Sequence, residues 1–331
     1  MASLQLSIAL SNNDRTRPVL DGAVRPDGVD LIPTVLHPSE MFWRQLSFQE
    51  FDVSEMSMSS LLIDIARGNS HWVALPVFTS RSFFHTGGWV RTDRGIERPE
   101  DLKGKRMGVP EYQQTAALWA RGVLHHEFGV RAQDIEWYME RTPERSHGGA
   151  TGFKPPEGIR LNQIPPEKSI GSMLVSGELD ATLLYIPDNN LVDRSREDLS
   201  ASPNLRRLFP DSAAESVRYY RKTGFYHINH GMVVRRSIYE KDPWVVLNLF
   251  HAFNKGREMV RTRSLELMDV YFRLGLLPED ARAAVQADPY SYGVKSNRII
   301  LEQIAQYSHE QGLTPRVLSL DEIFAPSTMD L

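Results

Sequence analysis

Short apolar runs separated by helical patterns occupy the first part of the chain. Strand-like runs, alternating or continuously apolar, occur at residues 4–10, 29–36, 51–53 and 72–78. Ser39, followed by apolar residues at helical spacing, predicts a capped helix, and residues 57–67 predict a second helix that ends at Gly68. Strands that alternate with helices are typical of a parallel sheet covered by helices, so an α/β fold is expected.

The middle of the chain repeats this order. Strands are predicted at 107–110, 181–185 and 227–234, and helices at 116–128, 169–175, 243–260 and around 300–307. Residues 142–166 are rich in Gly, Pro and charge, and are interpreted as an inserted surface loop and a candidate lid. Because the strand at 227–234 leads the chain back, we expect a discontinuous first lobe of residues 1–88 and 236–331. Residues 89–235 form the second lobe in this prediction.

Composition and charge narrow the class of protein. The 331 residues include 38 basic and 42 acidic ones, a net charge of −4, which does not suggest a nucleic-acid surface. Cysteine is absent, which excludes disulfides, thiolate metal sites and a cysteine nucleophile. No apolar run reaches the ~18 residues of a membrane span, and the N-terminus lacks the features of a signal peptide. We therefore expect a soluble, cytoplasmic protein without nucleic-acid or membrane partners.

Two stretches resemble the second lobe of type II periplasmic-binding-protein folds. Residues 101–109 read Asp-Leu-Lys-Gly-Lys-Arg-Met-Gly-Val, and residues 176–181 read Ser-Gly-Glu-Leu-Asp-Ala. The resemblance implies two lobes, each a mixed sheet flanked by helices, with a ligand cleft between them. Transport receptors, regulators and enzymes share this fold, so it does not define a function.

Four further stretches resemble the 4,5-dihydroxyphthalate decarboxylases over nearly the whole chain. They are residues 51–60, 76–85, 110–122 and 229–236. The resemblance implies loss of one carboxyl of 4,5-dihydroxyphthalate as CO2, giving protocatechuate, in aromatic (phthalate) catabolism. Two alternatives stay open: a non-catalytic binding protein for aromatic carboxylates in a transporter or sensor, and a decarboxylase of a related aromatic acid.

Such a reaction needs a proton donor at the carboxyl-bearing carbon and a base at the hydroxyl para to it. His230 is the first candidate for proton transfer, because histidine gains and loses protons near neutral pH; the alternative is a histidine bonded to a backbone carbonyl. Glu55 is the candidate carboxylate base, or else a carboxylate that complements a helix N-terminus. His85, where the chain leaves the first lobe, is a third catalytic candidate.

The substrate also needs cations and hydrogen-bond donors for its carboxylates. Arg81 stands alone between apolar runs and suits a bidentate grip on a carboxylate, with a surface ion pair as the alternative. The predicted helix start, where free N–H groups attract anions, supplies Gln113, Gln114 and Thr115, with capping of the helix as their alternative role. Further substrate-binding candidates, each with capping or core packing as the alternative role, are Ser57, Ser59, Tyr112, Arg121, Tyr185 and His227.

No cofactor is expected, because the substrate's own hydroxyl supplies the electrons that reach the ring carbon. The alternative is a divalent metal held by Glu55, His85 and His230, but no local metal-binding motif supports it. The partner we expect is a small aromatic dicarboxylate. The sequence leaves the oligomeric state open, with a homo-oligomer as one alternative.

Overall fold

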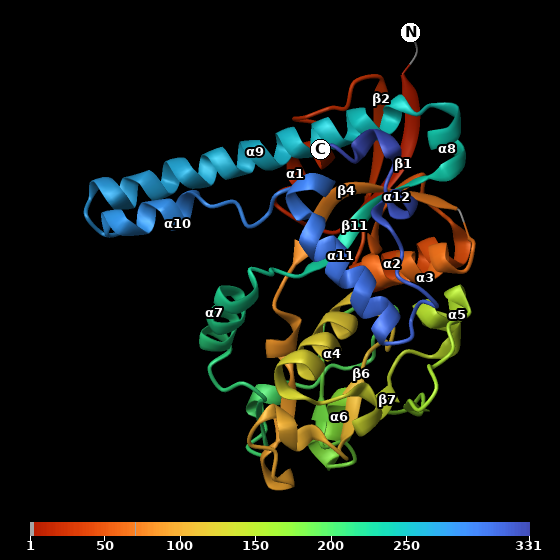
Figure 1. The fold of residues 1–331 in the computed structure, drawn as a ribbon, viewed down its shortest axis with the longest axis vertical. Coiled ribbons are helices and arrows are strands. Elements are labelled where there is room, and N and C mark those ends of the chain that lie inside the picture. Colours follow the sequence, from red (N-terminus) through yellow and green to blue (C-terminus); the bar gives the residue numbers. More distant parts are fainter. Residues whose placement is uncertain (1–2, 70) are drawn as a thin grey trace.

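The chain forms two sheets, one above the other in Figure 1. The computed structural model describes residues 3–69 and 71–331. The first sheet has the order β2-β1-β3-β11-β4, formed by β1 (Leu4–Leu10), β2 (Val29–Val35), β3 (Val53–Ser57), β4 (Trp72–Arg81) and β11 (Ile228–Arg235). The second has the order β10-β5-β9-β6-β7-β8, formed by β5 (Trp89–Arg91), β6 (Arg106–Val109), β7 (Glu136–Met139), β8 (Arg160–Gln163), β9 (Ala181–Thr182) and β10 (Leu205–Arg207).

Both sheets are mixed, as the resemblance to binding-protein folds implied. In the first sheet β1 runs parallel to β2 and β3, while β11 runs antiparallel to β3 and β4. In the second, β6 is parallel to β7 and β9, and β5 is antiparallel to β9 and β10. All five residues of β3 are buried, because helices cover the centre of the first sheet on both faces.

Strand β11 corrects the predicted boundary between the lobes. The prediction assigned residues 89–235 to the second lobe, but β11 lies inside the first sheet between β3 and β4. Its residues Met232, Val233 and Val234 are completely buried, and both of its edges pair with neighbouring strands. As a central strand, β11 forms backbone hydrogen bonds with neighbours on both sides. The chain has therefore returned to the first sheet by Ile228, where β11 begins. The division of the chain into lobes otherwise stays a prediction.

Residues 142–166 are not the surface loop that the sequence suggested. They contain α5 (His147–Thr151) and β8, which extends the second sheet beside β7. Helix α5 packs against α2 (Pro38–Phe48) and α3 (Met58–Ala66) of the first sheet. The Trp43 indole also donates to the carbonyl oxygen of Glu144 at 2.9 Å. The segment therefore joins the two halves of the molecule, which its Gly- and Pro-rich composition did not indicate.

A second connection lies where α4 (Thr115–Phe128) meets α11 (Val294–Glu310). Gly122 of α4 allows the close approach, because a Cβ there would lie 2.3 Å from the Tyr307 ring. The rings of Trp119 and Tyr307 are 5.6 Å apart in an edge-on arrangement. Gln311, just after α11, donates to the carbonyl oxygen of Leu118 at 2.9 Å. The C-terminal segment thus links the first sheet to the helix that covers the second.

The remaining helices surround the two sheets, and α9 projects from the body with α10 at its far end (Figure 1). They are α1 (Arg17–Leu20), α6 (Ile170–Ser176), α7 (Ser212–Thr223), α8 (Arg236–Lys241), α9 (Trp244–Arg273), α10 (Arg282–Gln286) and α12 (Leu320–Ile323). Short 3-10 helices complete the chain at Phe84–Gly87, Thr92–Arg94, Pro99–Leu102, Ala132–Asp134, Pro143–Arg145, Leu199–Ala201, Glu279–Ala281 and Pro326–Thr328. Within the described ranges, every helix is too short or too polar to span a bilayer. The cytoplasmic location stays a prediction of the sequence.

Candidate active site

Two adjoining cavities lie where the first sheet faces the second, and they share His37, Pro38 and His230. The first, which we call the cleft cavity, has a volume of about 360 Å3. Its other lining residues are Ser39, Phe42, Ser57, Phe84, Gly87, Gln114, Thr115, Ala116, Arg141, His147, Leu184, Tyr185, Ile186, Asp188, Arg207 and Asn229. The second, the side cavity, has a volume of about 570 Å3. Its other lining residues are Ser11, Asn12, Asn13, Arg15, Val35, Leu36, Thr79, Ser80, Arg81 and Tyr290.

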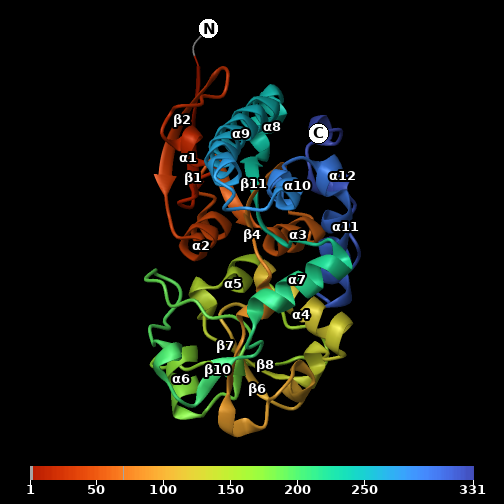
Figure 2. The ribbon, with the colours of Figure 1, turned by 90° about the vertical axis from the view of Figure 1, so that its left-hand side faces the viewer.

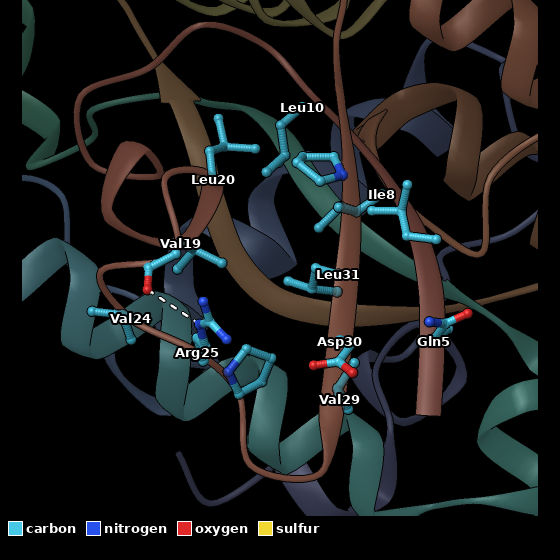
Figure 3. Close-up of a pocket in the computed structure, with 14 residues that line it drawn as sticks. Gln5, Ile8, Leu10, Val19, Leu20, Val24, Arg25, Val29, Asp30 and Leu31 are labelled. Carbon is cyan, nitrogen blue, oxygen red and sulfur yellow. Dashed lines mark hydrogen bonds between the residues drawn. The ribbon is translucent and has the colours of Figure 1, made fainter. Parts of the chain in front are cut away.

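Figure 3 shows a separate cavity of about 360 Å3 along β1 and β2, beside α1. Its walls are mainly aliphatic side chains such as Ile8, Leu10 and Val19. Arg25 and Asp30 are its charged lining residues, and no histidine lines it. Because this cavity offers no group that transfers protons near neutral pH, we place the site at the other two cavities.

His230 of β11 stands at the junction of the cleft and side cavities. Its Nδ1 lies 3.3 Å from the Oε2 atom of Glu55, on the neighbouring strand β3. Its Nε2 is 2.9 Å from the Nδ2 atom of Asn229. The amide of Asn229 donates to Nε2 in this arrangement, so the proton of a neutral His230 lies on Nδ1 and faces the Glu55 carboxylate.

Glu55 is buried behind His230 and lines neither cavity. Its Oε1 accepts two hydrogen bonds from Ser11, from the backbone N–H at 2.8 Å and from the hydroxyl at 2.6 Å. Burial alone would raise the pKa of Glu55, but the neighbouring His230 and the bonds from Ser11 hold it below the ordinary value. Glu55 is therefore an ionised carboxylate that orients His230, a different position from the substrate-facing base that the sequence suggested.

The predicted residues at the start of α4 do gather with β3 at the cleft cavity. The hydroxyls of Ser57 and Thr115 are 2.9 Å apart, and the backbone N–H of Ser59 donates to the Thr115 hydroxyl at 2.9 Å. Gln114 precedes the helix as its N-cap, and its buried Nε2 has no hydrogen-bond partner within the described chain. Ser57, Gln114 and Thr115 line the cavity, so this wall combines hydroxyls with the free N–H groups of a helix N-terminus.

Tyr185 also lines the cleft cavity, as does Arg207, a charged residue that the sequence did not single out. The Tyr185 hydroxyl donates to the carbonyl oxygen of Glu197 at 2.6 Å, which fixes the ring against the wall. Burial, followed by the charge of Glu197, raises the pKa of Tyr185, so the hydroxyl stays protonated. Arg207 lies over the ring of Trp89, 4.1 Å from its centre, and donates to the carbonyl oxygen of Gly87.

His85 and His227 lie in an aromatic cluster outside both cavities, which corrects their expected place in the site. The Nε2 of His85 is 3.1 Å from the Oε1 atom of Glu215 on α7. His227 stacks on Trp119 with ring centroids 4.4 Å apart, and its Nε2 is 3.0 Å from the Tyr219 hydroxyl. Burial lowers the pKa of His227 well below the ordinary value, so it is a neutral core histidine. The polar partners of both side chains are internal.

Four other residues predicted to contact the substrate have their partners inside the protein. They are Ser59, Tyr112, Gln113 and Arg121. Arg121 donates to the carbonyl oxygen of Tyr112 at 2.7 Å, and its guanidinium lies 4.0 Å from the centre of the Tyr112 ring. Gln113 accepts a bond from the Thr151 hydroxyl at 3.1 Å, while the Ser59 hydroxyl donates to the backbone carbonyl of Gln113. None of these four side chains lines either cavity. They hold the start of α4 in place instead of facing a ligand.

The alternative metal set of Glu55, His85 and His230 does not converge. His85 is bound to Glu215, and Glu55 lies behind His230. Throughout residues 3–69 and 71–331, no three or more His, Asp or Glu side chains gather in a way that would hold a metal ion.

Arg141 is the main functional candidate that the sequence did not reveal, since it borders the segment interpreted as a surface loop. Its Nε and Nη2 pair with the two oxygens of Asp193 at 2.7 and 3.1 Å. Nη2 also donates to the Ser39 hydroxyl at the start of α2, at 2.6 Å. The ion pair is almost completely buried, yet Arg141 lines the cleft cavity. One guanidinium therefore connects the second sheet, the first sheet and the cavity wall.

His147 is the second candidate found only in the structure. Its Nε2 is 3.1 Å from Nη1 of Arg141, and because arginine only donates, this nitrogen must accept. Burial and the charge of Arg141 lower the pKa of His147 well below the ordinary value. Phe42 packs edge-on against both His147 and His230, with centroids 5.8 and 4.7 Å away. A neutral imidazole and a phenyl ring thus form an apolar face beside His230.

Glu111 gives the region a pH-dependent stability. It is buried after β6, and its Oε2 accepts the backbone N–H of His147 at 2.9 Å. Burial raises the pKa of Glu111 from 4.5 to about 7. The folded state therefore binds this proton more tightly than the unfolded chain, so stability falls as the pH rises from about 4.5 to about 7.

We expect Glu111→Gln to remove this loss of stability. At about 1.36 kcal/mol per pKa unit, the contribution amounts to roughly 3 kcal/mol across the window. Urea unfolding of both proteins at about pH 4.5 and about pH 8 measures it, because other titrating groups cancel in the difference. The variant should gain stability relative to the wild type at the higher pH, and an equal pH dependence of the two proteins would refute the assignment.

Comparisons with known proteins place this geometry in context. No protein-family model matches the chain. It is 35% identical to 4,5-dihydroxyphthalate decarboxylase of Comamonas testosteroni over 333 aligned positions, which cover 100% of this chain and 99% of that protein. It is 43% identical to the protein of the same name from Pseudomonas putida over 183 positions, 55% of this chain and 71% of that protein.

Solved structures resemble the chain at much lower identity. The periplasmic aliphatic sulphonate binding protein SsuA from Escherichia coli has a TM-score of 0.56 at 13% identity, covering 98% of this chain and 92% of that one. The alkanesulfonate-binding protein SsuA from Xanthomonas axonopodis pv. citri has a TM-score of 0.58 at 13% identity, covering 98% and 99%. The desulfurization enzyme DSZB has a TM-score of 0.54 at 15% identity, covering 99% and 98%. These structures confirm the periplasmic-binding-protein-like fold.

Proposed function

This chain belongs to the 4,5-dihydroxyphthalate decarboxylase family, and from that premise we propose how its cleft removes one carboxyl of 4,5-dihydroxyphthalate. The chain is a carboxy-lyase of phthalate catabolism, and the products are protocatechuate and CO2. The observation that carries the mechanism is the His230–Glu55 pair, in which the imidazole borders both cavities and the carboxylate lies behind it. Proton transfer to carbon needs such an oriented group with access to the ligand.

The reaction replaces a carbon–carbon bond with a carbon–hydrogen bond. Removal of the proton from the hydroxyl para to the leaving carboxylate pushes electrons to the carbon that bears this carboxylate. That carbon takes a proton and the ring becomes a transient dienone. The electrons of the carbon–carbon bond then return to the ring as CO2 departs. This restores the aromatic ring as a phenolate, which takes back the hydroxyl proton to give the product. The substrate supplies its own electron source, so the proposed route uses no cofactor.

His230 is the proposed acid at the ring carbon. In the imidazolium form, Nδ1 faces the buried carboxylate of Glu55, and Nε2 carries the proton that is transferred. This step requires the Asn229 amide, which donates to the unprotonated Nε2, to turn away from that nitrogen. Glu55 acts as a positioning residue, because its carboxylate lies beside Nδ1 and fixes the orientation of the ring. Ser11 completes the arrangement by holding the other oxygen of Glu55.

The cleft cavity supplies the remaining requirements of the proposed reaction. Asp188 is the one carboxylate among the described residues that line it, and we assign it as the acceptor of the hydroxyl proton. Ser57, Thr115 and Tyr185 are proposed to contact the hydroxyl groups. Phe42 and Phe84 provide flat apolar walls for the ring. A volume of about 360 Å3 is in the range of small-molecule sites.

The test incubates the purified protein with 4,5-dihydroxyphthalate in a buffer containing a metal chelator, and measures CO2 and protocatechuate together. We expect equal amounts of both products, and a panel of related aromatic acids to react more slowly. Tight binding without turnover would favour a binding protein instead. Activity that the chelator removes and a divalent metal restores would overturn the cofactor-free route.

A further inference from the structure

The side cavity has an unusually one-sided charge. This charge comes from two arginines, Arg15 and Arg81, which are among its lining residues. The histidines His37 and His230 also line the cavity, and burial lowers the pKa of His37 below its ordinary value. Among the described residues that line it, there is no aspartate or glutamate. A cavity lined by cations without acidic side chains is suited to an anionic ligand.

Neither arginine has a counter-ion in the described part of the chain, where no carboxylate oxygen lies within 4.0 Å of either guanidinium. Arg15 follows β1, donates to the carbonyl oxygen of Thr79 at 2.7 Å and lies 4.0 Å from the centre of the Tyr290 ring. These contacts are with a carbonyl oxygen and an aromatic ring, so they do not neutralise the positive charge of Arg15. Because an uncompensated charge in a partly buried position is costly, an anion that enters the cavity gains the interaction that the protein omits.

Arg81 is held more rigidly than Arg15. It donates to the carbonyl oxygens of Tyr226 and Ser291, at 3.2 and 2.9 Å, and to the side-chain oxygen of Asn297 at 2.5 Å. Burial lowers the pKa of Arg81 to about 10, so it is still positively charged near neutral pH. Neutral hydrogen-bond acceptors thus fix the position of Arg81, and its positive charge remains available to an anion in the cavity.

The side cavity lies next to the proposed point of proton transfer. His230 lines both cavities, and Ser80 of β4 pairs with His230 in the strand register. The two carboxylates of the substrate are on adjacent ring carbons. When one of these carbons faces His230, the other carboxylate therefore lies close to the same imidazole.

We propose that the side cavity is the subsite for the carboxylate that stays on the ring, and that Arg15 is its main binding residue. The inference rests on the proposed function, since it assigns one part of that substrate. The retained carboxylate pairs with Arg15 and Arg81, while the ring and hydroxyls occupy the cleft cavity. The product protocatechuate keeps this carboxylate and binds through the same contact, whereas catechol, which has none, does not use the subsite.

The experiment measures binding of protocatechuate and catechol by calorimetry to the wild type, Arg15→Gln and Arg15→Lys. We expect Arg15→Gln to weaken protocatechuate about tenfold to a hundredfold, since one charge-assisted contact is lost. Catechol affinity should stay unchanged, and Arg15→Lys should recover part of the loss. The KM of the dicarboxylate should rise with the protocatechuate Kd, while kcat changes little. Arg25→Gln, in the cavity of Figure 3, is the matched control and should bind both ligands like the wild type.

A second variant tests the subsite without removing the contact between Arg15 and Thr79. Ser80→Asp places a carboxylate among the lining residues, where it competes for the arginines. Ser80→Asp should also weaken the binding of protocatechuate without changing the binding of catechol. Equal losses for both ligands, no loss for either, or no binding of protocatechuate to the wild type would overturn the inference. If the wild type binds protocatechuate through Arg15 but does not release CO2 from the dicarboxylate, the proposed function fails and the subsite stands.

Discussion

Replacing His230 with asparagine is expected to lower kcat by about 10²–10⁴-fold, the usual contribution of a positioned acid or base. Asparagine retains hydrogen bonding at a similar position but cannot transfer a proton. The pH–rate profile over about pH 6 to 8, where imidazoles titrate, should lose one limb in the variant. Steady-state kinetics of CO2 release across this range measures both effects.

Two controls separate loss of chemistry from loss of structure. Thermal unfolding of His230→Asn should stay close to the wild type, because Ser11 continues to hold Glu55. His126→Asn changes a partly exposed histidine that pairs with Glu310, outside both cavities, and should leave kcat unaltered. Near-normal kcat of His230→Asn throughout the pH range would show that another group carries the proton.

Replacing Arg141 with methionine is expected to destabilise the fold by about 3–5 kcal/mol, as breaking a buried ion pair does. The substitution leaves Asp193 buried and charged, and it removes the bonds to Ser39 and His147. Arg141 normally offsets the effect of burial and keeps the pKa of Asp193 below its ordinary value. Urea unfolding gives the change in free energy.

Further variants identify the uncompensated charge as the cause. The double variant Arg141→Met, Asp193→Leu should recover much of the stability, because no unpaired charge remains. Arg298→Met breaks the exposed pair with Glu302 and should cost at most about 1 kcal/mol. A loss of this small size for Arg141→Met would mean that the buried network does not stabilise the fold, and a double variant as unstable as the single one would point to packing instead.

Local sequence patterns were sufficient to predict the main strands and helices. The alternation in residues 4–10 is the observed β1, and the apolar run that begins at Trp72 is the buried part of β4. The helix expected to end at Gly68 ends at Ala66, with its cap at Arg67. These elements could be predicted because hydrophobic periodicity and a glycine at a helix end involve only residues that are close in sequence. The region 142–166 was misinterpreted because α5 and β8 are too short to produce a periodic signal.

The candidate site was predicted in part. His230, Arg81, Ser57, Gln114, Thr115 and Tyr185 line the two cavities, and their roles toward a substrate stay predictions. His85 and His227 carry the same functional groups, but Glu215 and Trp119, distant in sequence, bind them internally. No single-sequence pattern distinguishes an internal histidine from one that faces a cavity, because the partner decides the difference.

The sequence by itself determined the fold class and the resemblance to the decarboxylase family, and it selected His230 as the candidate for proton transfer, which stays a prediction. The tertiary structure alone decided which charged groups work together. Glu55 reaches His230 because β3 and β11 pair antiparallel, which brings together residues 175 positions apart. Arg141 meets Ser39 because α5 and its neighbours pack on the first sheet. Burial and pairing set the charge of each group, and both arise from contacts between distant segments that no local pattern records.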